Sequence, residues 1–145
     1  MNFRTLLKKS IVVLDGAMGT QLQGAGLPLG ELPEVWNLSR PQVIEGIHRE
    51  YFAAGADVVY TNTFGANCLK FGDRTEEVVA AAVRCAKSAA KGYKNKFVAL
   101  DIGPTGKLLK PLGDLGFEEA VKIFSRTISA GVKAGADLVA IETMN

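Results

Sequence analysis

The sequence predicts a parallel α/β fold built from repeated strand–helix units, and three observations lead to this class. Four short runs rich in Val, Ile and Leu recur at a spacing of about 40 residues, without the polar alternation of strands that face solvent. Each gap between them contains at least one amphipathic helical pattern, and a four-residue motif occurs twice just before a strand. The predicted strands are residues 11–15, 57–61, 97–101 and 137–143.

A helix is predicted between the first two strands, beginning near Pro41. Proline suits the first turn of a helix, and Ser39 and Gln42 have the spacing of a capping box. Gly55 ends the helix. His48 falls on the polar side of this helix, so we expect it on the surface. The predicted apolar face consists of Val43, Ile44, Ile47 and Tyr51.

Two further helices fill the remaining gaps, and each begins with acidic residues that complement the helix dipole. One starts at Thr75 and stops at Gly92, and the other starts at Glu118 and Glu119 and stops at Gly135. The apolar stripes are Val78, Val79, Ala82, Val83 and Ala86 in the former helix, and Phe117, Ala120, Val121, Phe124 and Ile128 in the latter.

The motif Ala-Gly-Ala-Asp links the end of a helix to the next strand at 54–57 and again at 134–137. A glycine stop followed by an aspartate that opens a strand makes a short connection. The segments that follow strands, 16–40, 62–74 and 102–116, are long and hold most of the Gly, Pro and Asn. Because binding sites of parallel α/β folds lie at the carboxyl ends of the strands, we expect function in these long loops.

Composition argues against several classes of function. The net charge is +2 and the Lys and Arg residues are dispersed, which argues against nucleic-acid and membrane partners and favours a small molecule. The apolar runs are far shorter than the roughly 20 residues that span a bilayer, and no signal-peptide pattern is present, so we expect a cytoplasmic protein. Cys68 and Cys85 are too few for a disulfide framework and are expected to be reduced thiols.

Three of the four predicted strands end on or next to an acidic side chain: Asp15, Asp101 and Glu142. If the strands are parallel neighbours, these carboxyl groups converge on one rim and could hold an amino group. Asp15 and Asp101 could instead accept hydrogen bonds from the glycine turns that follow them. Glu142 follows an apolar run, where an unpartnered carboxylate is costly to desolvate, so we interpret it as facing a ligand.

Two glycine-bearing turns, at 15–20 and 101–106, let backbone N–H groups approach a ligand closely. Neither matches a nucleotide-binding pattern, and both could be tight turns only. Trp36 and Phe64 could flank a ligand or fold loops back onto the sheet. The sequence contains no Ser-His-Asp set, Cys-His pair or two-cysteine metal spacing, so we assign no catalytic residue and no metal ligand.

Taken together and in order, the motifs at 14–20, 57–66, 101–106 and 141–143 resemble the homocysteine S-methyltransferase family. Pro-Leu-Gly at 111–113 is similar to the N-terminal module of the bacterial cobalamin-dependent methionine synthase branch. The resemblance covers essentially the whole chain. It implies that residues 1–145 form the N-terminal half, about four βα units, of a (β/α)8 TIM barrel with parallel strands.

The resemblance also implies a function in methionine biosynthesis, the transfer of a methyl group onto the thiolate of homocysteine. In the family, the carboxylates matching Asp15 and Glu142 help hold the amino acid end of homocysteine. Backbone groups matching Gly16 and Ala17 contribute from the first loop, and the second loop contributes around Thr63 and Phe64. The predicted substrate-binding residues are therefore Asp15, Gly16, Ala17, Thr63, Phe64 and Glu142.

The family's cofactors are implied by the same resemblance. Zinc held by three cysteines deprotonates the thiol, and methylcobalamin or another donor supplies the methyl group. The sequence given stops at Asn145, before positions that match those cysteines, so we expect the isolated chain to lack zinc and activity. Open strand edges would then favour self-association. Two alternatives stay open: a non-catalytic half-barrel that serves binding or assembly, and an independent four-stranded doubly wound sheet.

Overall fold

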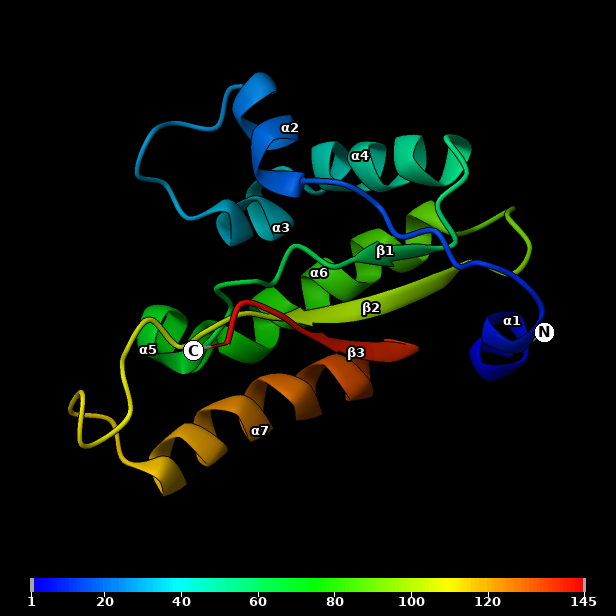
Figure 1. The fold of residues 1–145 in the computed structure, drawn as a ribbon. Helices are drawn as coiled ribbons and strands as arrows, with labels where there is room; N and C mark the ends of the chain where they lie inside the picture. The colour runs from blue at the N-terminus through cyan, green and yellow to red at the C-terminus, as the bar shows by residue number, and fades with distance from the viewer. Residues whose placement is uncertain (1, 145) are drawn as a thin grey trace.

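The computed structural model describes residues 2–144. Asn145, at which the predicted half-barrel segment 1–145 stops, lies outside the described residues. Three parallel strands form one sheet in the order β1-β2-β3, with helices packed along it (Figure 1). The strands are β1 (Val58–Tyr60), β2 (Phe97–Ile102) and β3 (Leu138–Ile141). The helices are α1 (Phe3–Lys9), α2 (Met18–Gly24), η1 (Pro33–Val35), α3 (Trp36–Ser39), α4 (Pro41–Ala53), α5 (Cys68–Phe71), η2 (Gly72–Arg74), α6 (Thr75–Ala89) and α7 (Phe117–Ala134).

Three of the four predicted strands are confirmed as a parallel sheet, with Val58 opposite Phe97 and Ala99 opposite Leu138. The first predicted strand, 11–15, is wrong as a regular strand, because it contributes only one parallel bridge, from Leu14 to Val58. The Val13 N–H donates to the Asp57 carboxylate at 3.0 Å rather than to a backbone carbonyl. This side-chain contact interrupts the backbone ladder, and the segment runs extended beside β1.

The two faces of the sheet have different partners, because side chains alternate along each strand. Leu100 and Ile102 of β2 pack with α6 and α7 in the largest apolar cluster. On the opposite face Phe97 and Ala99 cluster with Leu6 of α1, which covers the amino-terminal end of that face (Figure 1). Asp101 continues the row of Phe97 and Ala99, so the carboxyl end of this face carries polar groups.

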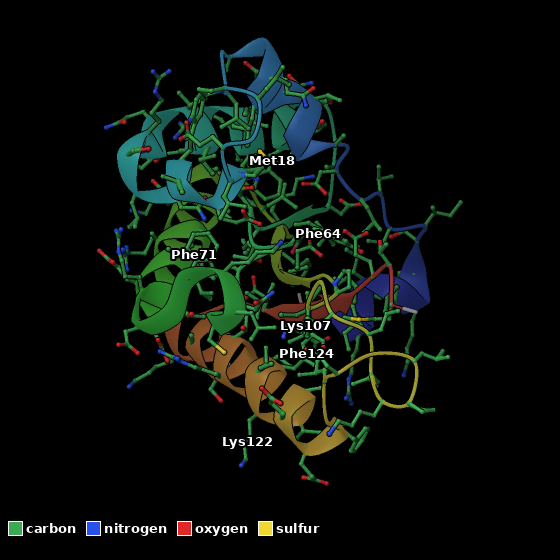
Figure 2. The ribbon with its side chains drawn as sticks, turned by 90° about the vertical axis from the view of Figure 1, so that its left-hand side faces the viewer. Met18, Phe64, Phe71, Lys107, Lys122 and Phe124 are labelled. Carbon is green, nitrogen blue, oxygen red and sulfur yellow. The ribbon has the colours of Figure 1, made fainter. Side chains whose placement is uncertain are left out.

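Helix α6 confirms its predicted apolar stripe, whereas the predicted face of α7 is partly wrong. Phe117 is 68% exposed and Val121 is 43% exposed. The buried side instead includes Gly131, where a side chain would collide with Leu100 of β2. Because α7 approaches the sheet through this glycine, the contact face is rotated relative to the prediction. Figure 2 shows Lys122 pointing away from the fold on α7. The buried residues of α7 are Ala120, Ile123, Thr127, Ala130 and Gly131.

Helix α4 begins at Pro41 as predicted, but the capping-box prediction is wrong. The helix is preceded by Arg40 without a side-chain cap, and Ser39 is the last residue of α3, where its hydroxyl donates to the Val35 carbonyl at 3.2 Å. The surface position predicted for His48 is also wrong. His48 is fully buried on the α4 face that includes Ile44, and neither ring nitrogen has a hydrogen-bond partner among the described residues.

The repeated Ala-Gly-Ala-Asp motif has one structural role in both of its copies. The Asp137 carboxylate accepts the N–H of Val98 at 2.8 Å and pairs with Lys87 at 2.6 Å. In the first copy the Asp57 carboxylate accepts the N–H of Val13 and pairs with Lys96 at 3.4 Å. Asp137 therefore ties the start of β3 to β2, and Asp57 ties the start of β1 to the extended segment 11–15. Within residues 2–144, no helix combines the length and apolar character needed to cross a bilayer.

Candidate functional site

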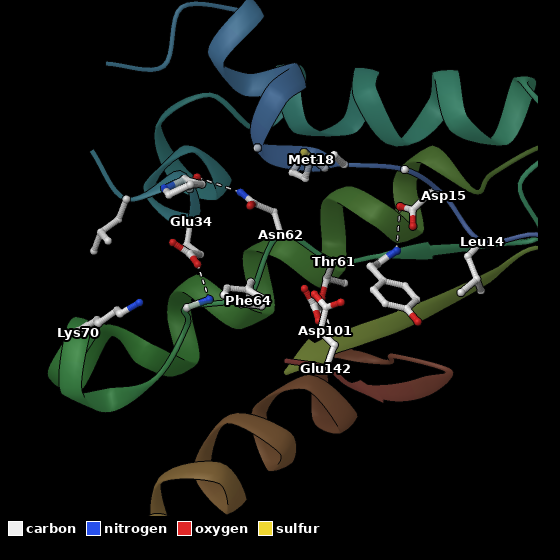
Figure 3. Close-up of a pocket in the computed structure, with 17 residues that line it drawn as sticks. Leu14, Asp15, Met18, Glu34, Thr61, Asn62, Phe64, Lys70, Asp101 and Glu142 are labelled. Atoms are coloured by element: carbon white, nitrogen blue, oxygen red, sulfur yellow. Dashed lines mark hydrogen bonds between the residues drawn. The ribbon is translucent and has the colours of Figure 1, made fainter. Parts of the chain in front are cut away.

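A cavity of about 630 Å³ opens at the carboxyl ends of the strands. Its wall comes from the loop that follows the Leu14 bridge, from η1, from the end of β1 and the loop after it, and from the ends of β2 and β3 (Figure 3). Two of the three long loops predicted to carry function, 16–40 and 62–74, meet in this wall, whereas loop 102–116 contributes no lining residue. The cavity has an acidic end around Asp15, Asp101 and Glu142, and a second end around Glu34 and Lys70 (Figure 3).

Asp15 lies at the acidic end of the cavity and is half-buried. Its carboxylate accepts the backbone N–H of Tyr60 at 2.9 Å, which joins the first loop to β1. Burial raises the pKa of Asp15 to about 6, the Tyr60 bond opposes this shift, and the negative charge of Glu142 adds to it. From the sequence, Asp15 could have accepted hydrogen bonds from the glycine turn that follows it. Its side chain instead accepts from the backbone of the neighbouring strand β1.

Asp101 is only 6% exposed, and a ring of hydrogen bonds fixes its backbone. Its N–H donates to the Thr61 hydroxyl at 3.1 Å, and its carbonyl accepts from the Thr63 hydroxyl at 2.7 Å. Because the Thr63 hydrogen is used there, the 2.7 Å contact between the two threonines has Thr61 as donor. Burial raises the pKa of Asp101 to about 7, and the nearby Glu142 carboxyl adds to the shift by its charge and by hydrogen bonding.

Glu142 follows β3, and its backbone N–H donates to the carbonyl of Ile102 at 3.1 Å. Its side chain lines the cavity but is exposed. Because Glu142 is exposed, the desolvation argument for its role does not apply, and the ligand-facing role stays a prediction that rests on its position in the cavity wall. Tyr60 stands beside this group, and burial, followed by the charges of Glu142, Asp101 and Asp15, raises the pKa of its hydroxyl.

Glu34 marks the other end of the cavity, and sequence reasoning missed it. It is 3% exposed, and its Oε1 accepts the N–H of Gly65 at 2.5 Å. A Cβ on Gly65 would lie 2.7 Å from both Glu34 Oε1 and Lys70 Nζ, so only glycine lets these two side chains approach. Nothing in the loop around Pro33 signalled a buried acid, because its placement depends on contacts with residues about 30 positions later.

A pair of asparagines positions η1 against the cavity. The Asn37 amide donates to the carbonyl of Asn62 at 2.8 Å, and the Asn62 amide donates to Asn37 Oδ1 at 3.0 Å and to the Pro33 carbonyl at 2.9 Å. Trp36 is buried in a neighbouring apolar cluster, where its ring N–H donates to Glu31 at 3.0 Å. Of the two roles considered for Trp36, the structure therefore supports folding of the loop.

Most of the predicted substrate-binding residues line the cavity, and one lies behind its wall. Gly16 and Ala17 line it, and Tyr51 donates to the Ala17 carbonyl at 3.0 Å while occupying the space that a Gly16 side chain would need. Phe64 lines it and is 41% exposed. Thr63 does not line it, because its side chain is buried behind the wall in the ring that holds Asp101. Met18, Glu34, Tyr60 and Lys70 are lining residues that were not predicted.

This arrangement suits a small molecule that carries a positive group. Three carboxyl side chains converge at one end, while Leu14, Met18 and Phe64 give the wall apolar surface for an aliphatic chain. Neither cysteine lines the cavity: Cys85 is buried in packing and Cys68 begins α5. Among residues 2–144, no group of three His, Cys, Asp or Glu side chains is placed to hold a metal ion.

Comparisons with known proteins agree on one family. The family model described as homocysteine S-methyltransferase matches residues 12–145. Methionine synthase from Mycobacterium tuberculosis (strain ATCC 25618 / H37Rv) is 35% identical, over 95% of this chain and 13% of the relative. Methionine synthase from Mycobacterium leprae (strain TN) is 36% identical, over 94% of this chain and 12% of the relative. The chain therefore spans about an eighth of the length of these relatives.

A solved structure gives the same result for the fold. The metallated form of the homocysteine methyltransferase MmuM from Escherichia coli superposes with a TM-score of 0.83 at 26% identity. The match covers 97% of this chain and 57% of the solved chain. The apo form of MmuM superposes with a TM-score of 0.76 at 30% identity.

Proposed function

Because this chain belongs to the homocysteine S-methyltransferase family, we propose that its cavity binds homocysteine as the acceptor of a methyl group in the formation of methionine. The observation that carries this proposal is the convergence of Asp15, Asp101 and Glu142 at the carboxyl ends of parallel strands. Carboxylates are the natural acceptors for the α-ammonium group of an amino acid. The apolar wall beside them suits the methylene chain and the sulfur.

The predicted contacts fit one orientation of the substrate. Asp15 and Glu142 are proposed to accept hydrogen bonds from the ammonium group. The ammonium and carboxylate groups of homocysteine are attached to the same carbon, so the carboxylate also has to lie near the acidic end. Gly16 and Ala17 follow Asp15 directly, and their backbone N–H groups are proposed to donate hydrogen bonds to the substrate carboxylate. Phe64 is proposed to contact the side chain of the substrate.

The chemistry at sulfur is proposed to need groups beyond those described here. Zinc, the metal implied by the family, would supply thiolate formation when bound. The donor sets within residues 2–144 do not fit a zinc site. The methyl donor, methylcobalamin or another compound, is likewise proposed only for the whole enzyme. The proposed role of these residues is to bind and orient the amino acid end of homocysteine.

The proposal is tested by isothermal titration of the chain with L-homocysteine, with and without zinc. Glu142→Gln removes a charged acceptor and keeps the shape, so we expect binding to weaken by roughly tenfold or more. Glu118→Gln makes the same change on the exposed start of α7 and is expected to leave binding unaltered. Absence of binding to the unaltered chain, or equal affinity in both variants, contradicts the proposal.

Self-association through strand edges stays a prediction. Val139 and Ile141 are 41% and 66% exposed on the outer strand β3, which supports it. Burial of such apolar surface between copies would be favourable. Light scattering on the titration samples is expected to give a mass above that of one chain. A monodisperse monomer at the highest concentration used contradicts the prediction.

A further inference from the structure

The contacts of the Asp101 carboxyl group do not explain a role for it in stabilising the fold. The backbone of Asp101 is fixed by the two threonine hydroxyls, but its side chain points into the cavity wall with Oδ1 buried and without a hydrogen-bond partner among the described residues. The residue is 94% buried. Burying a carboxyl oxygen without a donor is costly, so a partner supplied from the cavity would remove a real penalty.

Every titratable group that acts on Asp101 is acidic. Glu142 comes from the end of β3, Asp15 from the first loop and Glu34 from η1, and the hydroxyl of Tyr60 on β1 lies on the same face. Lys70 stands beside Gly65 at the other end of the cavity and does not neutralise this group (Figure 3). Two adjacent carboxyl groups can hydrogen-bond to each other only when one of them holds a proton. The acidic end of the cavity is therefore suited to a proton or to a cation that donates several hydrogen bonds.

We infer that Asp101 is a third substrate contact, whose carboxylate accepts a hydrogen bond from the ammonium group beside Asp15 and Glu142 and gives up a shared proton when the substrate binds. This inference rests on the proposed function. A primary ammonium group has three N–H donors, and the cavity presents three carboxyl groups to receive them. The sequence placed Asp101 on an acidic rim that could hold an amino group, but the predicted substrate-binding set left it out and nothing there gave it a proton to release.

Exchange of a proton for an ammonium group makes affinity depend on pH in a defined direction. With a pKa of about 7 in the free chain, Asp101 is mostly protonated at pH 6 and mostly ionised at pH 8. The bound ammonium group favours the ionised form, so affinity rises with pH, by about tenfold between pH 6 and pH 8 for one proton. Asp15, with a pKa of about 6, adds a smaller dependence at the acidic end of that range.

The experiment is titration calorimetry of the chain with L-homocysteine at pH 6, 7 and 8, each in two buffers of different ionisation enthalpy. The unaltered chain is expected to release about half a proton from Asp101 at pH 7 and close to one at pH 6. Asp101→Asn is expected to bind about tenfold more weakly at pH 8, with little proton release and a flattened pH profile. Asp73→Asn, an exposed aspartate outside the cavity, is the matched control and is expected to behave like the unaltered chain.

The outcomes separate this inference from the proposed function. If Glu142→Gln weakens binding while Asp101→Asn keeps both the affinity and the pH profile, the inference fails and the proposed function stands. If the unaltered chain binds no homocysteine, both fail. A structural role for Asp101 would lower affinity equally at all pH values and leave proton release unchanged, which also overturns the inference. Asp101→Ser, which removes the charge with a smaller side chain, is expected to repeat the loss of proton release.

Discussion

At Gly103 both the fold and the cavity depend on the absence of a side chain. Gly103 follows β2, and its N–H donates to the carbonyl of Phe64 at 3.2 Å. A Cβ at this position would lie 2.5 Å from that carbonyl oxygen and 2.7 Å from the Phe64 ring. The replacement Gly103→Ala therefore forces the loop that carries Phe64 away from β2 by about 0.9 Å, because ordinary contact begins near 3.4 Å.

The expected cost combines two terms. Overpacking against backbone that cannot rotate away costs about 1–3 kcal/mol, and weakening the Gly103 to Phe64 hydrogen bond costs about 1 kcal/mol. We therefore expect Gly103→Ala to lower the free energy of unfolding by about 3 kcal/mol. With a urea m-value of about 2 kcal/mol/M, the unfolding midpoint falls by about 1.5 M. Homocysteine affinity is expected to fall as well, because Phe64 lines the cavity.

Gly46→Ala is the matched control for this substitution. Gly46 lies within α4, has no atom within 4 Å of the added Cβ and has no left-handed backbone angle. Alanine is favoured over glycine in a helix, so we expect the variant to gain about 0.5–1 kcal/mol of stability. Urea unfolding followed by circular dichroism measures both variants. A midpoint for Gly103→Ala at or above that of the unaltered chain would refute the reasoning.

Two further predictions concern buried or shared polar groups. Burial lowers the pKa of His48 from 6.5 to about 4, so folding excludes its proton and stability is lost as the pH falls from about 6.5 toward 4. Between pH 7 and pH 5 the unaltered chain should lose about 2 kcal/mol in its free energy of unfolding because of His48, and His48→Leu should not show this loss. Urea unfolding at both pH values measures it, and an equal loss in the two proteins contradicts the prediction. Asp137→Ala removes the acceptor of the Val98 N–H and the partner of Lys87, and should lower stability by about 1–2 kcal/mol. A thermal melt that matches the unaltered chain would show that the repeated motif has no such role.

The sequence predicted the elements whose signals are local. The apolar stripe of α6 and the strands β2 and β3 follow from patterns within a few neighbouring residues, and the structure confirms them. Segment 11–15 has the same composition as a strand, yet its Val13 N–H donates to the Asp57 carboxylate instead of a backbone carbonyl, and the segment makes a single bridge. His48 lies at a helical position whose burial depends on packing between distant helices, which periodicity within α4 does not report.

The residues of the candidate site also fall into those that local sequence signals predict and those that they do not. Asp15, Asp101 and Glu142 were predictable as a group, because each ends or follows a recognisable apolar run and parallel strands bring such ends together. Glu34 was not predictable, since it reaches the cavity only through the asparagine pair that fixes η1. Thr63 was expected to contact the substrate because it lies in a matching motif. Its hydroxyl holds the backbone of Asp101, which needs coordinates to see, and a contact of its backbone with the substrate stays a prediction.

The central claim is that the acidic end of the cavity receives the ammonium group of homocysteine. A crystal structure of the chain soaked with L-homocysteine tests it most directly. We predict density for the amino acid at the acidic end, with its nitrogen within about 3.2 Å of carboxylate oxygens of Asp15 and Glu142. Homocysteine bound at the Glu34 and Lys70 end, or with its carboxylate turned toward the three acids, would contradict the account.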